Sequence, residues 1–241
     1  MICALLLLLG IAPPCVHVAS AQSVTETASP RTEGPAPGIN DRFVDPDLEV
    51  QEWIDRFEGE SREIFAEREV ICQATRIKAG MRIADIGAGT GFFSRLFAEK
   101  TGPTGRVYAV DISPGFIRHI NELNEQLEIT NVSALRCAED SVNLPAASVD
   151  LAFICDTYHH FEYPQQTMKS IHTALRPGGQ LVLIDFEREV GKSREWILGH
   201  VRAGKATFRE EIESAGFEFE DEVSVDGFRE NYLLRFRKHA S

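Results

Sequence analysis

The sequence has few positive charges for its length. Its 241 residues include 25 Lys and Arg against 37 Asp and Glu, which gives a formal net charge of −12. Nonspecific nucleic-acid binding needs a field that attracts phosphate, and an acidic membrane surface repels such a chain. The charge balance therefore argues against a nucleic-acid partner and against a protein that lies on an acidic membrane.

Cysteine is scarce and irregularly placed. The five cysteines form no CxxC pair, and no histidine spacing typical of zinc accompanies them. Cys3 and Cys15 fall near the N-terminus, which leaves Cys72, Cys137 and Cys155 in the body of the chain. A scattered, odd set is not a disulfide framework. We therefore predict a domain with reduced thiols and no metal site.

Apolar runs long enough to cross a bilayer comfortably are also missing. The N-terminal run Ile2–Ala12 has the length of a signal-peptide core, and Ala19-Ser20-Ala21 supplies an A-x-A cleavage motif. No Lys or Arg precedes the run, so an uncleaved anchor and a mis-started reading frame are alternatives. We predict a signal-peptide-like leader over residues 1–21. The Ser, Thr, Pro, Gly and Ala content then predicts a disordered linker over residues 22–46.

The remaining residues, 47–241, have the length of one α/β domain. Apolar residues at three-to-four spacing predict helices over 47–77, with Asp47 as an N-cap and Gly59 between two helices. After Gly80, β and α segments alternate, which predicts a parallel sheet with helices on both faces. A short turn at Asp226-Gly227 joins the last two strands, so one of them runs antiparallel.

A glycine-rich turn follows the first predicted strand. In IADIGAGTGF (Ile83–Phe92), glycines stand at the alternate positions Gly87, Gly89 and Gly91. A dinucleotide fingerprint, G-x-G-x-x-G, would need its third glycine where Phe92 stands. The Lys-Ser/Thr pair of a P-loop does not follow the turn either. The turn is therefore not built for the close approach of a pyrophosphate.

Two acids accompany this turn. Asp111 ends the second predicted strand, 20 residues after Gly91, where a carboxylate can accept both hydroxyls of a ribose. Asp85 directly precedes the turn, near the place for a cationic amino group. A cofactor with an adenosine, no phosphate and a charged amino-acid tail fits this set. S-adenosylmethionine meets that description.

Four segments resemble the class I S-adenosylmethionine-dependent methyltransferases, in the methyltransferase type 11 group that includes the ubiquinone-pathway C-methyltransferases. They are IADIGAGTG (83–91), VYAVDIS (107–113), SVDLAFICDTYHHF (148–161) and ALRPGGQLVLIDF (174–186). The resemblance covers about two-thirds of the chain, from Arg76 onward. It implies a Rossmann-like, seven-stranded, mostly parallel sheet with an antiparallel last strand. It also implies an enzyme acting on a small-molecule acceptor, with the helical segment 47–77 as a lid over that acceptor.

The resemblance also assigns residues to the cofactor. The matching positions are Asp85, Gly87, Ala88, Gly89, Gly91, Asp111, Ile112, Ala138, Glu139 and Cys155. Among them, Asp85 is implied to hold the amino group, Asp111 the ribose, and Ile112 to pack on the adenine. Cys137 stands where the family often carries an acid, and acids follow at Glu139 and Asp140. Which side chain reads the adenine amino group therefore stays open.

The loop after the fourth predicted strand carries the catalytic candidates Asp156, Tyr158, His159 and His160. Ligands of open α/β sheets bind at the carboxyl ends of the strands, so this loop should face the reacting methyl group. A histidine is a suitable base at neutral pH if the acceptor must lose a proton. The sequence does not distinguish His159 from His160, and packing or helix capping is the alternative role for either.

Three further alternatives stay open. A basic segment could clamp an anionic substrate or form a solvated helix face; its residues are Arg188, Lys192, Arg194, His200, Arg202 and Lys205. The three body cysteines leave a metalloid (arsenite-type) methyltransferase as an alternative, and a non-catalytic cofactor-binding module is another. The leader favours export, whereas the cofactor and the free thiols favour the cytoplasm. The sequence does not predict the oligomeric state.

Overall fold

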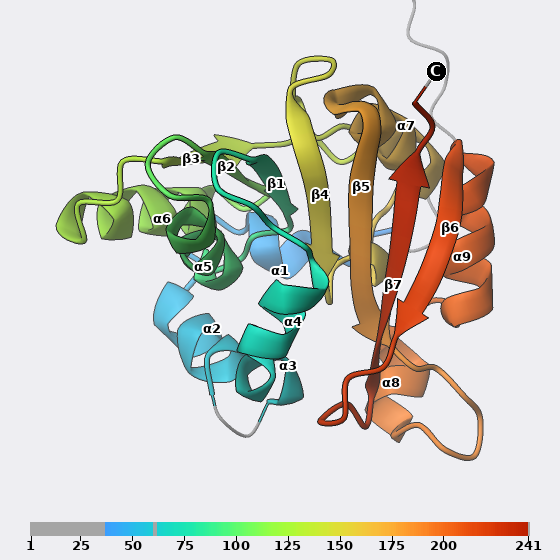
Figure 1. Cartoon of the computed structure of the whole chain (residues 1–241). Coiled ribbons are helices and arrows are strands. Elements are labelled where there is room, and N and C mark those ends of the chain that lie inside the picture. Colours follow the sequence, from blue (N-terminus) through green and yellow to red (C-terminus); the bar gives the residue numbers. More distant parts are fainter. Residues whose placement is uncertain (1–36, 60–61, 241) are drawn as a thin grey trace, which may run out of the picture. The chain divides into compact units, whose positions relative to one another are not determined.

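A computed structural model describes residues 37–59 and 62–240. The predicted leader and most of the predicted linker lie outside these residues. In chain order, the elements are α1 (Asp41–Val44), α2 (Val50–Phe57), α3 (Glu63–Ala66), α4 (Arg68–Ala74), β1 (Arg82–Ile86), α5 (Phe92–Thr101), β2 (Arg106–Asp111), α6 (Pro114–Gln126), β3 (Val132–Arg136), β4 (Val149–Cys155), the 3₁₀ helix η1 (Tyr158–His160), α7 (Pro164–Ala174), β5 (Leu175–Phe186), α8 (Glu195–His200), α9 (Lys205–Ser214), β6 (Phe217–Val223) and β7 (Asn231–Lys238). Figure 1 shows their arrangement.

The described strands form a seven-stranded sheet in the order β3-β2-β1-β4-β5-β7-β6. The pairs from β3 to β5 are parallel, and β7 runs antiparallel to both of its neighbours, β5 and β6. The predicted Rossmann-like sheet with an antiparallel last strand is therefore confirmed. The strand order reverses between β1 and β4, and ligands of open α/β sheets bind at the carboxyl ends of the strands beside such a switch point.

Successive side chains of the strands point to opposite faces of the sheet and pack into two apolar layers, one on each face. In β1, Ile83 packs with α4 and α5 on one face, whereas Ala84 and Ile86 belong to the layer covered by α7 and α9 on the other. This alternation follows from the two-residue period of a strand. The central strands β4 and β5 are apolar on both faces, as parallel strands buried between helices must be.

The N-terminal helical segment differs from the prediction in two places. The linker predicted to run to residue 46 ends earlier, because residues 41–44 form α1 and the ring of Phe43 packs 4.7 Å from that of Trp53. The Asn40 amide also donates a 3.0 Å hydrogen bond to the His160 carbonyl. Asp47 is not the N-cap of α2, which begins at Val50 without a capping side chain.

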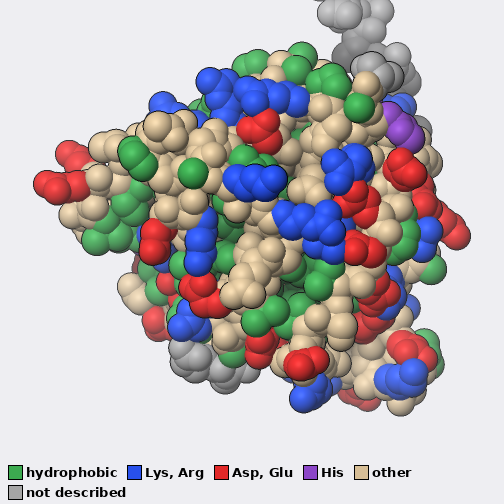
Figure 2. Space-filling view, in the orientation of Figure 1, with side chains coloured by type: hydrophobic (Ala, Val, Ile, Leu, Met, Phe, Trp, Pro, Cys, Tyr) green, Lys and Arg blue, Asp and Glu red, His purple; other side chains and the backbone are tan. Residues whose placement is uncertain are grey.

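The surface carries both charge signs. Figure 2 shows Lys and Arg side chains interspersed with Asp and Glu on the face in view, over β4 to β7 and the helices α4 and α5. Many of these form pairs, such as Arg176 with Asp150 at 2.6 Å and Lys100 with Glu69 at 2.8 Å. Within residues 37–59 and 62–240, no helix has both the length and the apolar character needed to span a bilayer.

Candidate active site

A cavity of about 770 Å³ opens at the carboxyl ends of β1, β2, β4 and β5. Small-molecule sites typically measure about 300–1,000 Å³, so this one is large. The glycine turn and the strand ends form its floor, and residues of α1, α2 and α8 form its walls. Figure 1 shows α2, α3 and α8 spread along the side of the molecule toward which β5 points, with α8 beside the end of β5. The segment predicted to cover the acceptor thus contributes Trp53, Phe57 and Arg62 to the cavity wall.

The glycine turn joins β1 to α5 with three left-handed residues, Gly87, Gly89 and Gly91, at φ of 71°, 54° and 75°. A Cβ on Gly87 would lie 2.1 Å from Cγ2 of Thr157, so glycine is required where the turn meets the loop after β4. At Gly89 the nearest atom, from Phe57, would be 3.6 Å away, and its backbone faces the cavity. Gly91 does not line the cavity, because it is the N-cap of α5 and lies against Ile120.

Asp111 is arranged to accept hydrogen bonds from a ligand. Its Oδ2 accepts the Gly89 N–H and its Oδ1 the Ser113 N–H, each at 2.8 Å. Each carboxylate oxygen therefore keeps one lone pair for a hydroxyl, and the side chain lines the cavity. Burial raises the pKa of Asp111 to about 6, although the two backbone donors oppose the shift.

Asp85 is the second buried carboxylate on the cavity floor. Its Oδ2 accepts a 2.6 Å hydrogen bond from the hydroxyl of Ser94 in α5. Burial raises its pKa to about 7, and the nearby Asp111 adds to the increase. A buried charge needs a partner of opposite sign, and a cationic group in the cavity would supply one.

The predicted adenine side of the site also lies on the cavity wall. Ile112, Cys137, Ala138 and Glu139 follow the ends of β2 and β3 and line the cavity. Cys155, at the end of β4, lines it as well. The Thr167 hydroxyl donates to the Glu139 carbonyl at 3.2 Å, which holds this turn against α7. The structure therefore brings together all the predicted cofactor residues except Gly91.

Asp156 lines the cavity, but both of its oxygens are engaged. Arg62 contacts Oδ2, and the Asn231 amide donates to Oδ1 at 2.6 Å. Its φ of 48° lies in the left-handed region that few non-glycine residues adopt. Burial raises the pKa of Asp156 despite the Arg62 guanidinium. Asp156 therefore links α3, β4 and β7.

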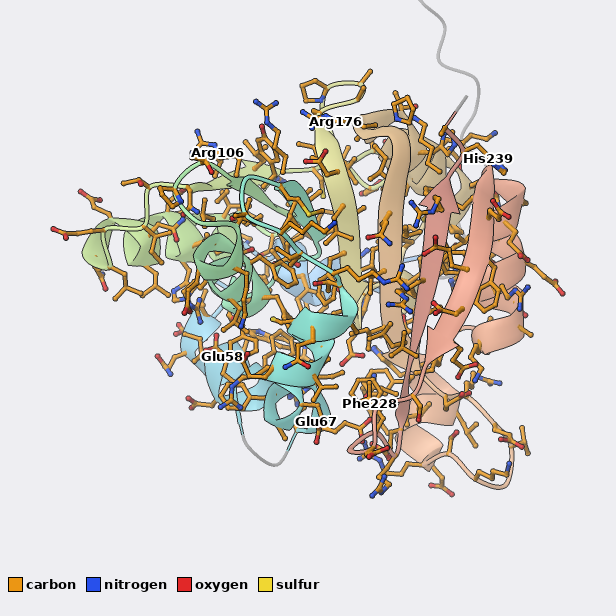
Figure 3. All side chains as sticks on the ribbon, viewed as in Figure 1. Glu58, Glu67, Arg106, Arg176, Phe228 and His239 are labelled. Atoms are coloured by element: carbon orange, nitrogen blue, oxygen red, sulfur yellow. The ribbon has the colours of Figure 1, made fainter. Side chains whose placement is uncertain are left out.

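A second link joins α3 to the β6–β7 loop and to the start of β7. The Glu63 carboxylate accepts the N–H groups of Arg229, Glu230 and Asn231, at 2.7, 3.1 and 2.7 Å. We call this contact the Glu63 clasp. Figure 3 shows Glu67, just after α3, and Phe228, on the β6–β7 loop, at the same edge of the molecule. The clasp holds the β6–β7 loop to the helical segment that walls the cavity.

The two histidines after β4 have different surroundings. His159 is 1% exposed, and its Nδ1 lies 2.8 Å from Oδ1 of the fully buried Asp185. His160 instead places Nε2 3.3 Å from Nε2 of His200, at the end of α8, while its Nδ1 is buried without a hydrogen-bond partner among the described residues. Burial lowers the pKa of His160 to about 2, and the two neighbouring histidines add to the decrease.

Tyr158, one of the predicted catalytic residues, does not line the cavity. Its side chain is fully buried, and its hydroxyl donates to Glu211 of α9 at 3.0 Å. The ring packs 4.9 Å from that of Phe208. Tyr158 and His159 are neighbours in η1, but their side chains point to different sides. Tyr158 packs in the core, whereas His159 lines the cavity.

The basic segment does not form an anion clamp. Lys192, Arg194, Arg202 and Lys205 each pair with glutamate carboxylates, and Arg188 donates to the Leu198 carbonyl. Among its six residues, Arg194 and His200 line the cavity. These glutamates neutralise most of the positive charge of the segment, which agrees with the alternative of a charge-balanced helix face.

Sequence reasoning missed Asp185, which contacts the cavity residue His159, and the part that α8 plays in the cavity wall. Asp185 occupies the carboxyl end of β5, as Asp85 and Asp111 do in β1 and β2, and that shared position was a usable signal. Trp196 stacks on His200 with ring centroids 4.8 Å apart and lines the cavity, although half of it is exposed. The short helix α8, which places both residues there, carried no clear periodicity.

The cavity residues fit S-adenosylmethionine. The buried Asp85 has room for a cationic partner, and Asp111 has acceptor sites for two hydroxyls. The backbone of Gly87 to Gly89 lines the cavity. These three features match the amino group, the ribose and the methionine chain of that cofactor.

Comparisons with known proteins agree with this fit. The methyltransferase domain family matches residues 77–223. Curated relatives include the ubiquinone/menaquinone biosynthesis C-methyltransferase UbiE of Pseudomonas syringae pv. syringae, 26% identical over 117 residues, which are 48% of this chain and 46% of the relative. The same enzyme of Hydrogenovibrio crunogenus is 28% identical over 113 residues, 46% of this chain and 44% of the relative. The matched part thus spans about half the length of these relatives.

Solved structures share the fold. A SAM-dependent methyltransferase from Aquifex aeolicus aligns with a TM-score of 0.68 and 24% identity, over 77% of this chain and 97% of that one. An S-adenosylmethionine-dependent methyltransferase from Mesorhizobium loti aligns with a TM-score of 0.58 and 20% identity, over 74% and 99%. With the family match over residues 77–223, the chain belongs to the methyltransferase domain family and is a class I S-adenosylmethionine-dependent methyltransferase.

Proposed function

We propose that this enzyme methylates a small molecule with an aromatic or other flat apolar body. This acceptor binds between the cofactor cradle, formed by Asp85, Gly87 to Gly89 and Asp111, and the histidines His159, His160 and His200. The observation that carries the proposal is the continuity of the cavity. The cofactor residues Asp85 and Asp111 line this cavity of about 770 Å³. The same cavity is also lined by His159, His160 and His200. One cavity can therefore hold both reactants in contact.

Aromatic side chains support a flat acceptor. The rings of Phe43, Trp53 and Phe57 follow one another at centroid distances of 4.7 and 5.2 Å along one wall. On the side of α8, Phe186 and Trp196 meet edge to face at 5.4 Å. Such walls favour ring-shaped ligands through stacking and apolar burial. The names of the UbiE relatives fit an aromatic acceptor, although the match covers less than half of those proteins.

The chain's contribution to the reaction is positioning and water exclusion. Bound S-adenosylmethionine supplies an activated methyl group. The aromatic walls orient the acceptor, and alignment of two bound reactants is a large source of rate enhancement. Where the acceptor must lose a proton, His159 is the better placed of the two predicted bases, because Asp185 fixes its Nδ1–H and leaves Nε2 as the acceptor. His160 has no such carboxylate partner.

The geometry gives no support to the metalloid alternative. Cys72 belongs to α4 and is buried in the core, whereas Cys137 and Cys155 line the cavity. Burial raises the pKa of Cys137 to about 12 and that of Cys155 well above the usual value, so neither is a thiolate at neutral pH. Metalloid binding requires thiolates.

The test is a screen for release of S-adenosylhomocysteine with phenols, quinols, thiols and aliphatic amines as acceptors. We expect turnover with planar aromatic acceptors, and a loss of turnover in Trp53→Ala with cofactor affinity unchanged. Turnover confined to aliphatic amines, or an unchanged acceptor preference in Trp53→Ala, would contradict the proposed acceptor class.

A further inference from the structure

Three histidines from two separate segments meet on the cavity wall. His159 and His160 come from η1, and His200 comes from the end of α8. One ring nitrogen of each lies within 4.8 Å of those of the other two. We call this group the histidine cluster. It was invisible in the sequence, because 40 residues separate His160 from His200.

The spacing of one pair within the cluster matches metal ligation, and the candidate ligand atom of His159 lies within 4.8 Å of both. The Nε2 atoms of His160 and His200 are 3.3 Å apart. Two imidazole nitrogens that bind one tetrahedral zinc ion at about 2.0–2.1 Å are themselves separated by about 3.3–3.4 Å. A single N–H···N hydrogen bond between the two rings is the alternative explanation of this distance, and the third histidine beside them is what favours an ion.

Asp185 supplies the second shell that a histidine ligand needs. Its Oδ1 lies 2.8 Å from His159 Nδ1, and Oδ2 accepts the His159 backbone N–H at 3.2 Å. A carboxylate on Nδ1 fixes the tautomer in which Nε2 carries the lone pair, and metal-binding histidines almost always have such a partner. Trp196 stacks on His200, and Phe43 packs edge-on against His160 at 5.3 Å, so the other two rings are also held in place.

We propose that His159, His160 and His200 bind a divalent transition-metal ion, with Zn²⁺ as the reference ion, and that Asp185 orients His159 as a ligand. Imidazole ligands suit Zn²⁺, Fe²⁺, Ni²⁺ and Cu²⁺ rather than Mg²⁺ or Ca²⁺. Three histidines leave the fourth position open, as catalytic zinc sites do. All three residues line the acceptor cavity, so that open position faces the acceptor.

The ion would activate the acceptor directly. A phenol or thiol bound at the open position loses its proton to solvent, because the cation stabilises the conjugate base. The electron-rich acceptor then forms a bond to the methyl carbon, and the carbon–sulfur bond of the cofactor breaks with its electron pair on sulfur. His159 is then a ligand rather than a base. This acceptor role rests on the proposed function, whereas metal binding does not.

The first experiment measures metal content without any reaction. The full chain, purified without a polyhistidine tag, is incubated with Zn²⁺ or Co²⁺, desalted and analysed by elemental mass spectrometry and visible absorption. We expect one ion per chain and the absorption bands of tetrahedral Co²⁺. His200→Gln and His160→Gln should each weaken metal affinity more than about 100-fold, and Asp185→Asn about 10- to 100-fold.

The matched control is His239→Gln. His239 is exposed and lies at the opposite edge of the sheet from the cavity, as Figure 3 shows, so this variant should bind the ion like the parent. His200→Cys restores a ligand atom and should give a thiolate-to-Co²⁺ charge-transfer band, which a merely structural role would not produce. Less than stoichiometric metal in the parent, or equal uptake by His200→Gln and His239→Gln, would overturn the metal site.

The second experiment separates the site from its role. Chelation followed by re-addition of Zn²⁺ should abolish and restore S-adenosylhomocysteine release with a phenol or thiol acceptor, while calorimetric cofactor binding stays constant. Activity that survives full metal removal would overturn the acceptor role and return His159 to the role of a base. Failure of cofactor binding itself would instead contradict the methyltransferase assignment.

Discussion

Replacement of Asp111 by Asn tests the cofactor cradle most directly. Both Asp111 oxygens already accept a backbone N–H at 2.8 Å, from Gly89 and from Ser113, and each retains one acceptor site. Asn keeps one acceptor oxygen but presents an NH₂ group at the other position. At least one ribose hydroxyl then loses its partner, and one backbone N–H faces another donor. A hydrogen bond to a charged group contributes about 1.5–3 kcal/mol, so the dissociation constant for S-adenosylmethionine should rise at least about tenfold.

Calorimetric titration with S-adenosylmethionine measures this effect, and thermal unfolding checks the fold. Because burial raises the pKa of Asp111, its ionised form is disfavoured in the folded protein, and its removal should leave the melting temperature nearly unchanged. Asp226→Asn, on the exposed β6–β7 loop, is the matched control and should bind the cofactor like the parent. An unchanged affinity in Asp111→Asn with an intact fold would refute the ribose-binding role.

Three further predictions concern Asp85, Gly87 and Tyr158. Burial raises the pKa of Asp85 to about 7, and the ammonium group of the cofactor favours the ionised carboxylate. As the pH increases toward 7, the affinity for S-adenosylmethionine should therefore rise by up to about tenfold per pH unit, and above pH 7 it should level off. Between about pH 6 and 7, above the pKa of about 6 of Asp111, calorimetry should lose this slope in Asp85→Asn, and a parent profile without slope there would contradict the assignment. Gly87→Ala should lower the melting temperature more than Gly102→Ala, since both have positive φ but only Gly87 meets Thr157; strain of this kind costs about 1–3 kcal/mol. Tyr158→Phe should lower the free energy of unfolding by about 1 kcal/mol and leave turnover unchanged, and a selective loss of turnover would place Tyr158 in the reaction.

The cofactor half of the site could be predicted from sequence because its determinants are local. Gly87 and Gly89 follow a buried strand, and Asp111 ends the next one, so strand geometry alone places them together. The alternation of strands and helices likewise fixed the sheet, down to the antiparallel β7. Such features depend on neighbours in the chain or on adjacent parallel strands.

The acceptor half depends on contacts that sequence spacing does not show. His200 reaches His160 only because the short helix α8 folds back over the end of β5. Phe43 stands in a segment whose composition predicts disorder, yet its ring completes the aromatic wall beside Trp53. The 3₁₀ turn η1 sends the side chain of Tyr158 into the core and that of His159 to the cavity. Tertiary contacts decide each of these cases.

The Glu63 clasp has a consequence for how the enzyme assembles and diversifies. It joins residues 166 to 168 positions apart, and such long-range contacts are costly in loop entropy and tend to form late in folding. We therefore expect the sheet and the cofactor cradle to form first. The acceptor chamber, which is the part of the cavity lined by the aromatic side chains and the histidines, should close last. Because the clasped segments contribute chamber walls but not the glycine turn, exchange of residues 37–66 between related enzymes should transfer acceptor preference while the ability to bind the cofactor persists.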